Sequence, residues 1–425
     1  MKRLLCALLA GSACVAAWGQ GLSADANFLT RGEIRSGGLS AVEGGPDFAA
    51  FILERTLIGV GYGQDALSVR VTAQHSGVWG SSETDAFTLN EAWVRLSSKK
   101  GFFAQLGRQN ISYDDQRIFG TDDWAMTARS HDALKLGYEG HGHRVHLVGG
   151  YNQNIANLEG GSFFSGGIQP YKSLAALWYH YDIPHTGLGV SLLAMDAGMQ
   201  SGEKGVDEAT RHQQIVGTYL SWKPAKWNLE AAYYRQMGMD ESGLPIEAWM
   251  TSGKVEFSPS ASVSIYGGYD FLSGDKYFAT PPKGQLGIVR HDVLRGFSSL
   301  YGSHHKFYGA MDFFYVTTYV NGFTPGLQNS FLGVRWRPVE SLALDASFHY
   351  LATATKLENT GQTLGYEAEF SAFWQVLKDV RLGLGYSFMK GSQTMVKLKR
   401  TDDRRQLQWA WLMLNATPSF LNGKH

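Results

Sequence analysis

Residues 380–388 read Val380-Arg381-Leu382-Gly383-Leu384-Gly385-Tyr386-Ser387-Phe388. Large apolar side chains occupy every even position, and Arg, Gly or Ser occupies every odd one. Successive side chains of a strand point to opposite faces. A period of two therefore predicts a strand with one apolar and one polar face.

The same alternation recurs along most of the chain, in longer runs that include residues 67–74, 144–147, 332–337, 342–349 and 364–371. The runs extend over about ten to thirteen residues, close to the length of a tilted membrane-spanning strand and longer than an ordinary globular strand. We find no long amphipathic helix, and no apolar run after residue 20 is long enough for a transmembrane helix. The pattern indicates an all-β protein whose strands cross a membrane.

The connections between these runs fall into two classes. Tight turns are expected at Ser97–Gly101, Glu139–Gly142, Lys223–Lys226, Ser258–Ala261 and Arg337–Ser341. Long loops rich in Gly and acidic residues are expected at 36–48, 78–85, 114–127, 154–169, 199–209 and 238–246. Short periplasmic turns and long extracellular loops are typical of outer-membrane β-barrels.

Counting the strands requires one decision. A direct count gives nineteen if residues 305–316 form a strand, but bacterial single-chain barrels have an even number. The strand at 261–272 leaves a tight turn and the strand at 327–338 enters one, so residues 273–326 must form a single extracellular excursion. We therefore predict a transmembrane antiparallel β-barrel of 18 strands. Its last strand, 406–417, carries Trp409 and Trp411, which we expect at the lipid interface.

A soluble β-sandwich, solenoid or propeller is the alternative fold. No internal repeat is evident, and the apolar face consists of Leu, Val, Trp, Tyr and Phe along its whole length. Such a face is costly in water and favourable in lipid, which supports the membrane barrel.

The N-terminus predicts export. Lys2 and Arg3 precede an apolar run that ends in small residues at Ala17 and Gly19, the pattern of a secretory signal peptide. We expect residues 1–19 to be removed and residues 20–425 to form the barrel in the outer membrane of a Gram-negative cell. A lipoprotein signal ending at Cys14 is the alternative.

Both cysteines, Cys6 and Cys14, lie in the predicted signal, so the mature chain has no disulfide and no thiolate metal ligand.

The charge balance argues against a nucleic-acid partner. Lys plus Arg (38) equals Asp plus Glu (38), whereas nucleic-acid binding needs a basic surface. Removing Lys2 and Arg3 leaves the mature chain near a net charge of −2.

Residues 106–120, Leu106-Gly107-Arg108-Gln109-Asn110-Ile111-Ser112-Tyr113-Asp114-Asp115-Gln116-Arg117-Ile118-Phe119-Gly120, followed by Asp123-Trp124 and Arg129-Ser130, resemble the alginate-export family of outer-membrane proteins. Segments 89–96, 269–275, 305–309, 365–369 and 383–387 are similar to further family motifs in the same order, so the resemblance covers about residues 50–416. It implies an eighteen-stranded monomeric barrel with a charged pore for an anionic polysaccharide or a small polar solute, and periplasmic export components as partners.

Charged residues that alternate with the apolar face are expected to line the pore, because a Lys or Arg facing lipid at mid-depth costs roughly 2–4 kcal/mol. These residues are Arg70, Glu91, Arg95, Lys135, Arg335, Asp345, His349, Glu367, Glu369 and Arg381. The resemblance adds Arg55, Arg108, Arg129 and Asp270. They could form a ladder of guanidinium groups that bind an anionic saccharide weakly. Alternatively, Arg–Glu and Arg–Asp pairs neutralise the lumen and only keep it wet.

The loops at 114–129 and 273–326 are the candidate gates. Arg117, with Asp114, Asp115, Asp122 and Asp123, could fold inward and narrow the pore. The alternative is an exposed loop whose charges only cap the rim of the barrel.

Enzyme signals are weak. The chain has no His-Glu-x-x-His, Gly-x-Ser-x-Gly or phosphate-binding motif, and we expect no cofactor. The His pairs at 141/143 and 304/305 lie in a turn and a loop, so we expect no metal site. Ser130 and His131 are adjacent on a strand and would point to opposite faces, which disfavours a barrel-embedded hydrolase. That class and a structural or adhesin barrel remain the alternatives to a channel.

Overall fold

The computed structural model describes residues 21–36, 48–83, 85–156, 158, 160–167, 169–275, 292–315, 319, 323–357, 360–399 and 406–421. The predicted signal peptide, residues 1–19, lies outside the described residues.

Eighteen long strands and one short strand follow one another along the described chain. The first nine long strands are β1 (Leu22–Ser36), β2 (Ala49–Gln64), β3 (Leu67–Val78), β4 (Ala86–Ser97), β5 (Phe102–Gln109), β6 (His131–Gly140), β7 (His143–Tyr151), β8 (Ser173–Ile183) and β9 (Leu188–Ser201). The remaining strands are β10 (Ala209–Trp222), β11 (Trp227–Met239), β12 (Pro245–Ser260), β13 (Val263–Leu272), β14 (Leu327–Val339), β15 (Leu342–Ala352), β16 (Thr363–Leu377), β17 (Val380–Gly391), β18 (Gln406–Ala416) and β19 (Ser419–Leu421).

Each long strand pairs antiparallel with its neighbours in sequence, and β1 pairs with both β2 and β18. The sheet is therefore closed, which confirms the predicted 18-stranded antiparallel barrel. The short β19 also pairs with β1, after a break in register, and continues the line of β18.

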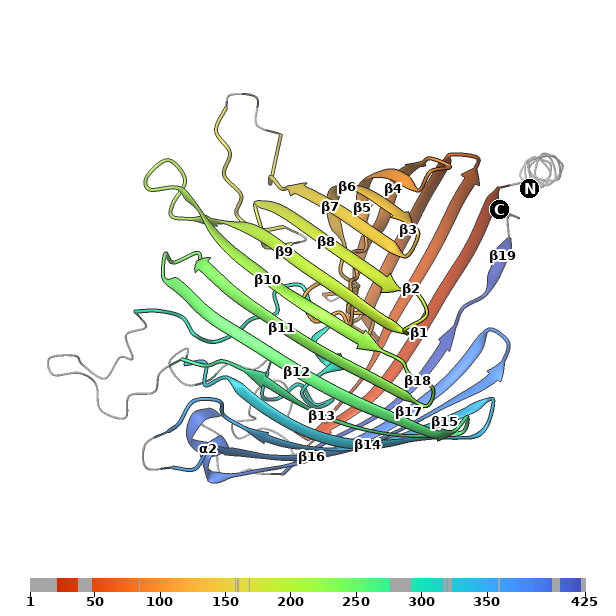
Figure 1. The fold of residues 1–425 in the computed structure, drawn as a ribbon, viewed down its shortest axis with the longest axis vertical. Coiled ribbons are helices and arrows are strands. Elements are labelled where there is room, and N and C mark those ends of the chain that lie inside the picture. Colours follow the sequence, from red (N-terminus) through yellow and green to blue (C-terminus); the bar gives the residue numbers. More distant parts are fainter. Residues whose placement is uncertain are drawn as a thin grey trace, which may run out of the picture.

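The two ends of the barrel differ, as Figure 1 shows. Tight turns and the described chain ends lie at one end, the turn end, and all five predicted tight turns join strands there. The longer connections lie at the opposite, loop end. Among the described residues no barrel strand lies between β13 and β14, so the strand count agrees with the parity argument. His305 lies in a 3-10 turn, η1 (His304–Lys306), and a short helix, α2 (Gln393–Lys399), lies between β17 and β18.

The outward face of the strands is apolar. Leu106, Leu332 and Leu412 are 57–63 % exposed, although each lies within a strand. Trp222, Trp227, Trp336 and Trp374 are also exposed near the turn end. An apolar band with aromatic residues at its edge is what a lipid bilayer stabilises. No described helix is long and apolar enough to cross a membrane.

Candidate functional site: a lumen crossed by two loops

The connection between β5 and β6, residues 110–130, crosses the barrel interior, and we call it the first inner loop. Asp114 accepts hydrogen bonds from Ser191 on β9 and Trp178 on β8. At the other side of the lumen, Arg31, Arg55 and Gln74 on β1–β3 donate to main-chain carbonyls of residues 123–126. Strand side chains therefore bind this loop at both sides of the lumen, through the Asp114 side chain at one side and through the backbone at the other.

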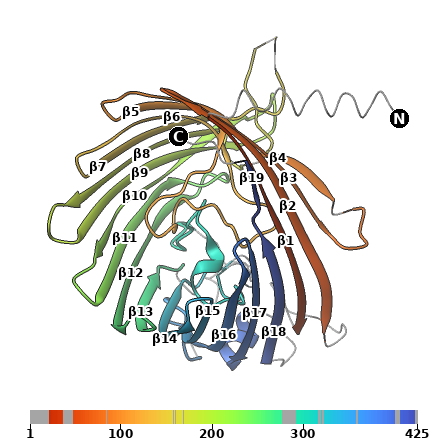
Figure 2. The ribbon, with the colours of Figure 1, turned by 90° about the vertical axis from the view of Figure 1, so that its right-hand side faces the viewer.

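Residues 292–315 form the second inner loop, and they pack directly on the first. Phe119 and Tyr301 form a parallel β-bridge. The Ser303 amide donates to the Gln116 carbonyl at 2.9 Å, and Arg129 donates to the Gly302 carbonyl. The two loops thus form one hydrogen-bonded unit within the ring of strands (Figure 2).

Arg117 is the central cation of this unit. Its guanidinium donates to Asp115 of its own loop at 2.7 Å, to the Tyr308 hydroxyl of the second loop at 2.8 Å and to Asp270 of β13 at 2.8 Å. Asn329 on β14 donates to the second Asp270 oxygen. Every one of these side chains has a partner, so Arg117 ties both loops to the wall.

Two carboxylates of β16 bind backbone N–H groups of the second inner loop. Glu367 accepts from the Met311 amide at 2.8 Å, and Glu369 accepts from the Ala310 amide at 2.7 Å. Gly309 has φ +92°, and a Cβ there would lie 2.4 Å from a Glu367 oxygen. Only glycine allows this close approach.

Trp124 is the apolar anchor of the first inner loop. It lies 4.0 Å from the Arg31 guanidinium, stacks on His305 at 4.4 Å, and meets Trp409 and Trp411 edge-on. The expectation that Trp409 and Trp411 face lipid is wrong. They alternate with Ala410 and the exposed Leu412, and they point inward because the loop supplies an apolar partner there.

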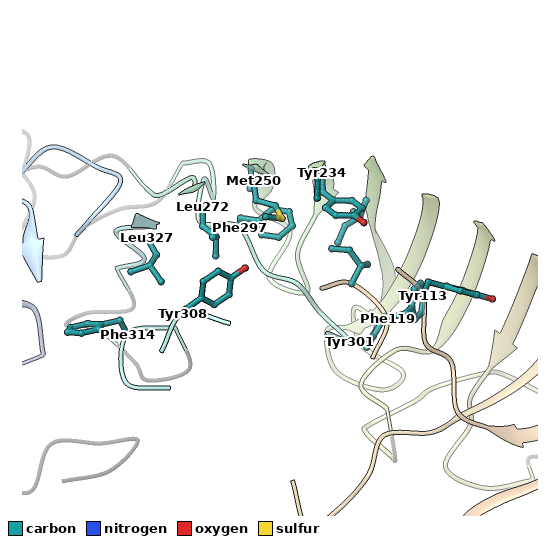
Figure 3. Close-up of a cluster of buried hydrophobic side chains, with 14 of the residues drawn as sticks. Tyr113, Phe119, Tyr234, Met250, Leu272, Phe297, Tyr301, Tyr308, Phe314 and Leu327 are labelled. Carbon is teal, nitrogen blue, oxygen red and sulfur yellow. The ribbon is translucent and has the colours of Figure 1, made fainter. Parts of the chain in front are cut away.

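Buried aromatic side chains fill the contact between the two loops and the wall (Figure 3). Phe119 and Tyr301 have ring centroids 5.7 Å apart, and Tyr113 stacks on Trp178 at 4.5 Å. Phe119 and Tyr301 are almost fully buried. Packed rings therefore hold the two loops and the wall together in addition to the polar contacts.

A polar cavity of about 280 Å³ lies between the inner loops and the wall of β11–β16. Both basic and acidic side chains line it: Arg117, Lys254, Lys306 and Arg335, with Asp115, Glu230, Asp270, Asp345 and Glu369. Arg335 contacts Asp345 at 3.2 Å and Glu256 at 3.4 Å. His349 is hydrogen-bonded to Asn329 at 2.9 Å and lies 3.5 Å from Glu369.

Among the other predicted wall cations, Arg70 and Arg95 have a carboxylate partner. Arg70 donates to both oxygens of Asp25 at 2.7 Å, and Arg95 lies 3.7 Å from Glu139 and over the Phe103 ring. Glu91 accepts from the Trp93 indole. Lys135 lies in the same inward row as His131 and Ala133. Arg381 lies against Phe373 near the turn end.

Arg108 does not line the pore, contrary to the prediction. It shares the outward face of β5 with Leu106 and donates to both oxygens of Asp132, at 2.8 and 2.7 Å. The pair lies at the loop ends of β5 and β6. A charge on the outer face costs little there, because it is close to the membrane interface and neutralised by its partner.

The acids of the first inner loop are held in a poorly hydrated environment. Burial raises the pKa of Asp114 to about 6, although hydrogen bonds from Ser191 and Trp178 act in the opposite direction. Burial also raises the pKa of Asp122, opposed by Arg129. Burial lowers the pKa of His304 to about 4 in the second loop. The docked loops therefore favour the neutral forms of these groups.

Several site residues were absent from the prediction. Lys254 and Glu256 alternate with Val255 and Phe257, so the period of two could have identified them. Arg31 and Glu33 on β1 form a buried pair at 2.8 Å and follow the same rule. Ser191 and Trp178 offered no such signal, because their role depends on where Asp114 is placed.

A serine, a histidine and an aspartate are linked on β8 and β9. Ser191, His180 and Asp182 are linked by hydrogen bonds of 2.8 and 2.9 Å. However, Ser191 is fully buried and its hydroxyl donates to Asp114, so it is not free to act as a nucleophile. No group of three His, Cys, Asp or Glu among the described residues is placed to bind a metal ion.

Residues 25–149 match the family model for alginate export. The resemblance predicted from residues 106–120 is therefore confirmed over this part of the chain. No curated protein matches the sequence.

Solved structures share the fold over nearly the whole chain. OccK2 (OpdF) of Pseudomonas aeruginosa is 12 % identical with a TM-score of 0.63, and OccK9 (OpdG) of the same organism is 13 % identical with a TM-score of 0.62. A structure of OccK2 in complex with glucuronate is 11 % identical with a TM-score of 0.62. In each case the match covers 94 % of this chain and 98 % of the solved chain. The protein is thus an outer-membrane β-barrel of a Gram-negative cell, with the fold of outer-membrane channels.

Proposed function

We propose that the protein is a channel that passes small polar solutes, sugars and sugar acids among them, one at a time past the two inner loops. The observation that carries this proposal is the polar cavity between the loops and the β11–β16 wall. The Arg, Lys, Asp and Glu side chains that line it can exchange hydrogen bonds with hydroxyl and carboxylate groups of a solute. Weak binding at several such positions permits passage.

The size of the solute follows from the inner loops. Both loops are tied to the wall, by Arg117 at Asp270 and by Glu367 at residue 311. A polysaccharide chain would need both loops to leave the lumen, whereas a single sugar needs only local rearrangement. Export of an anionic polysaccharide, the function implied by the alginate-export match, is therefore the second candidate.

The chemical class of the solute is supported by two observations. Lys306 extends into the cavity and has no ion pair among the described residues, so it can bind a carboxylate. One solved neighbour is in complex with glucuronate. We further propose that the turn end faces the periplasm and that the barrel acts as a monomer.

Liposome swelling tests this proposal. Purified barrel is reconstituted, and swelling rates are compared for glucose, glucuronate and an alginate hexamer. We expect the two monosaccharides to enter at measurable rates and the hexamer to be excluded. Entry of the hexamer at the glucose rate would favour the polysaccharide exporter. No swelling with any solute would contradict a channel.

A further inference from the structure

The inner wall at the turn end carries two arginines whose guanidinium groups make no ion pair among the described residues. Arg337 at the end of β14 and Arg381 at the start of β17 line one cavity of about 650 Å³, together with Ser262, Ser341, Phe373 and Gln375. This cavity is separate from the polar cavity beneath the loops, with which it shares no lining residue. It opens where the barrel is free of the inner loops.

Neither arginine has an acidic partner among the described residues. Arg381 is held by the Phe373 ring, 4.1 Å from its guanidinium carbon, a contact that covers one face and leaves the N–H edge open. The only carboxylate that lines the cavity is Glu340, and it makes no ion pair with either arginine within the described chain. In contrast, Arg70, Arg117 and Arg335 are each bound to at least one carboxylate.

We propose that Arg337 and Arg381 form an anion-binding site at the turn end, which holds a carboxylate or phosphate group of a passing solute. The inference rests on the proposed channel function and adds a second position to it. Guanidinium groups bind both oxygens of such anions in a planar, bidentate manner. A mouth of low-dielectric walls with unneutralised cations also concentrates anions.

The polar side chains around the arginines suit this role. The Gln375 amide is held in place by the carbonyls of residues 377, 378 and 380, so its own oxygen remains available to a solute hydroxyl. The Phe373 ring lies against the Arg381 guanidinium and helps to fix its position. The site therefore fits a small hydroxylated acid better than a bare inorganic anion.

Calorimetric titration of the purified full-length barrel in detergent with citrate tests the site without requiring conductance. We expect Arg337→Gln/Arg381→Gln to weaken citrate binding about tenfold or more, because hydrogen bonds to charged groups are the strong class. Arg337→Lys/Arg381→Lys should give an intermediate affinity, since the charge remains but the bidentate geometry is lost. The matched control is Lys99→Gln/Lys100→Gln, which removes two positive charges from a turn at the same end and should not change the affinity.

Current block by citrate in planar bilayers then locates the site. Block should be stronger when citrate is added at the turn end, and this asymmetry should disappear in Arg337→Gln/Arg381→Gln. Unchanged citrate affinity in that variant would overturn the anion site and leave the channel itself intact. Failure of the channel would appear instead as absent swelling with glucose, whatever the citrate affinity.

Discussion

Arg117 and Asp270 are 153 positions apart in the chain, and inside the barrel the Arg117 guanidinium donates a 2.8 Å hydrogen bond to the Asp270 carboxylate. Both side chains are almost completely buried. The contact joins the first inner loop to β13 at the level where the second inner loop also binds Arg117 through Tyr308. It is therefore the point at which both loops and the wall are held together.

Breaking this pair should release the loops. Arg117→Ala leaves Asp270 buried without its cation, and breaking a buried pair of this kind costs about 3–5 kcal/mol. We expect single-channel conductance to rise severalfold and loop residues to become accessible to protease, while the heat-modifiable migration of the barrel is retained. Arg108→Gln removes an arginine from the outer face and is the control. Wild-type conductance in Arg117→Ala would contradict the role of the pair.

The pKa of Asp114 predicts a pH-dependent loop. Burial raises this pKa to about 6 in the docked loop, compared with about 3.9 for an unperturbed aspartate. Between these values the docked state binds a proton that the undocked state does not, so docking becomes more favourable as pH falls from 6 to 4. Asp114→Asn is neutral at every pH. The single-channel current through Asp114→Asn should be lower than the wild-type current at pH 7.5, because the neutral side chain favours the docked loop. Near pH 4 the two currents should be equal. A difference of the same size at both pH values would exclude Asp114 as the titrating group, since all other groups are common to both proteins.

Charges in the lumen should set ion selectivity. Arg95→Glu/Arg335→Glu replaces two inward cations by anions, so the reversal potential in a salt gradient should shift toward cation selectivity. The shift should decrease at 1 M salt, where the screening length is about 3 Å. A reversal potential that does not change at low salt would place these side chains outside the conduction path.

The orientation of the barrel is testable with inserted tags. A tag in the loop at 203–207 should be labelled on intact cells, and one in the turn at Lys223–Lys226 should be labelled only after permeabilisation. Labelling of the 223–226 tag alone on intact cells would invert the proposed topology.

The barrel could be predicted from sequence because strand faces alternate independently of tertiary contacts. The alternation at 380–388 corresponds to β17, and parity alone placed residues 273–326 in one excursion. Alternation could not separate the inward face from the outward face where both faces are apolar. In β18, Trp409 and Leu412 lie on opposite sides.

The interior of the barrel was harder to predict. Glu367 and Glu369 were predicted to line the pore, and Glu369 does line the polar cavity. That they also accept hydrogen bonds from the backbone N–H groups of residues 310 and 311 could not be predicted, because backbone groups leave no signal in the sequence. The outward position of Arg108 could have been predicted, because Arg108 lies two residues after the apolar Leu106 and so shares its face of the strand. The family motif was instead taken to place Arg108 in the pore.

The central claim is that two loops inside the lumen, rather than the width of the barrel, limit passage. Single-channel conductance of a variant in which residues 112–128 and 298–315 are replaced by short Gly-Ser linkers tests it most directly. We predict a conductance several times that of the wild type, with heat-modifiable migration showing that the barrel still forms. A correctly folded variant with wild-type conductance would contradict the claim.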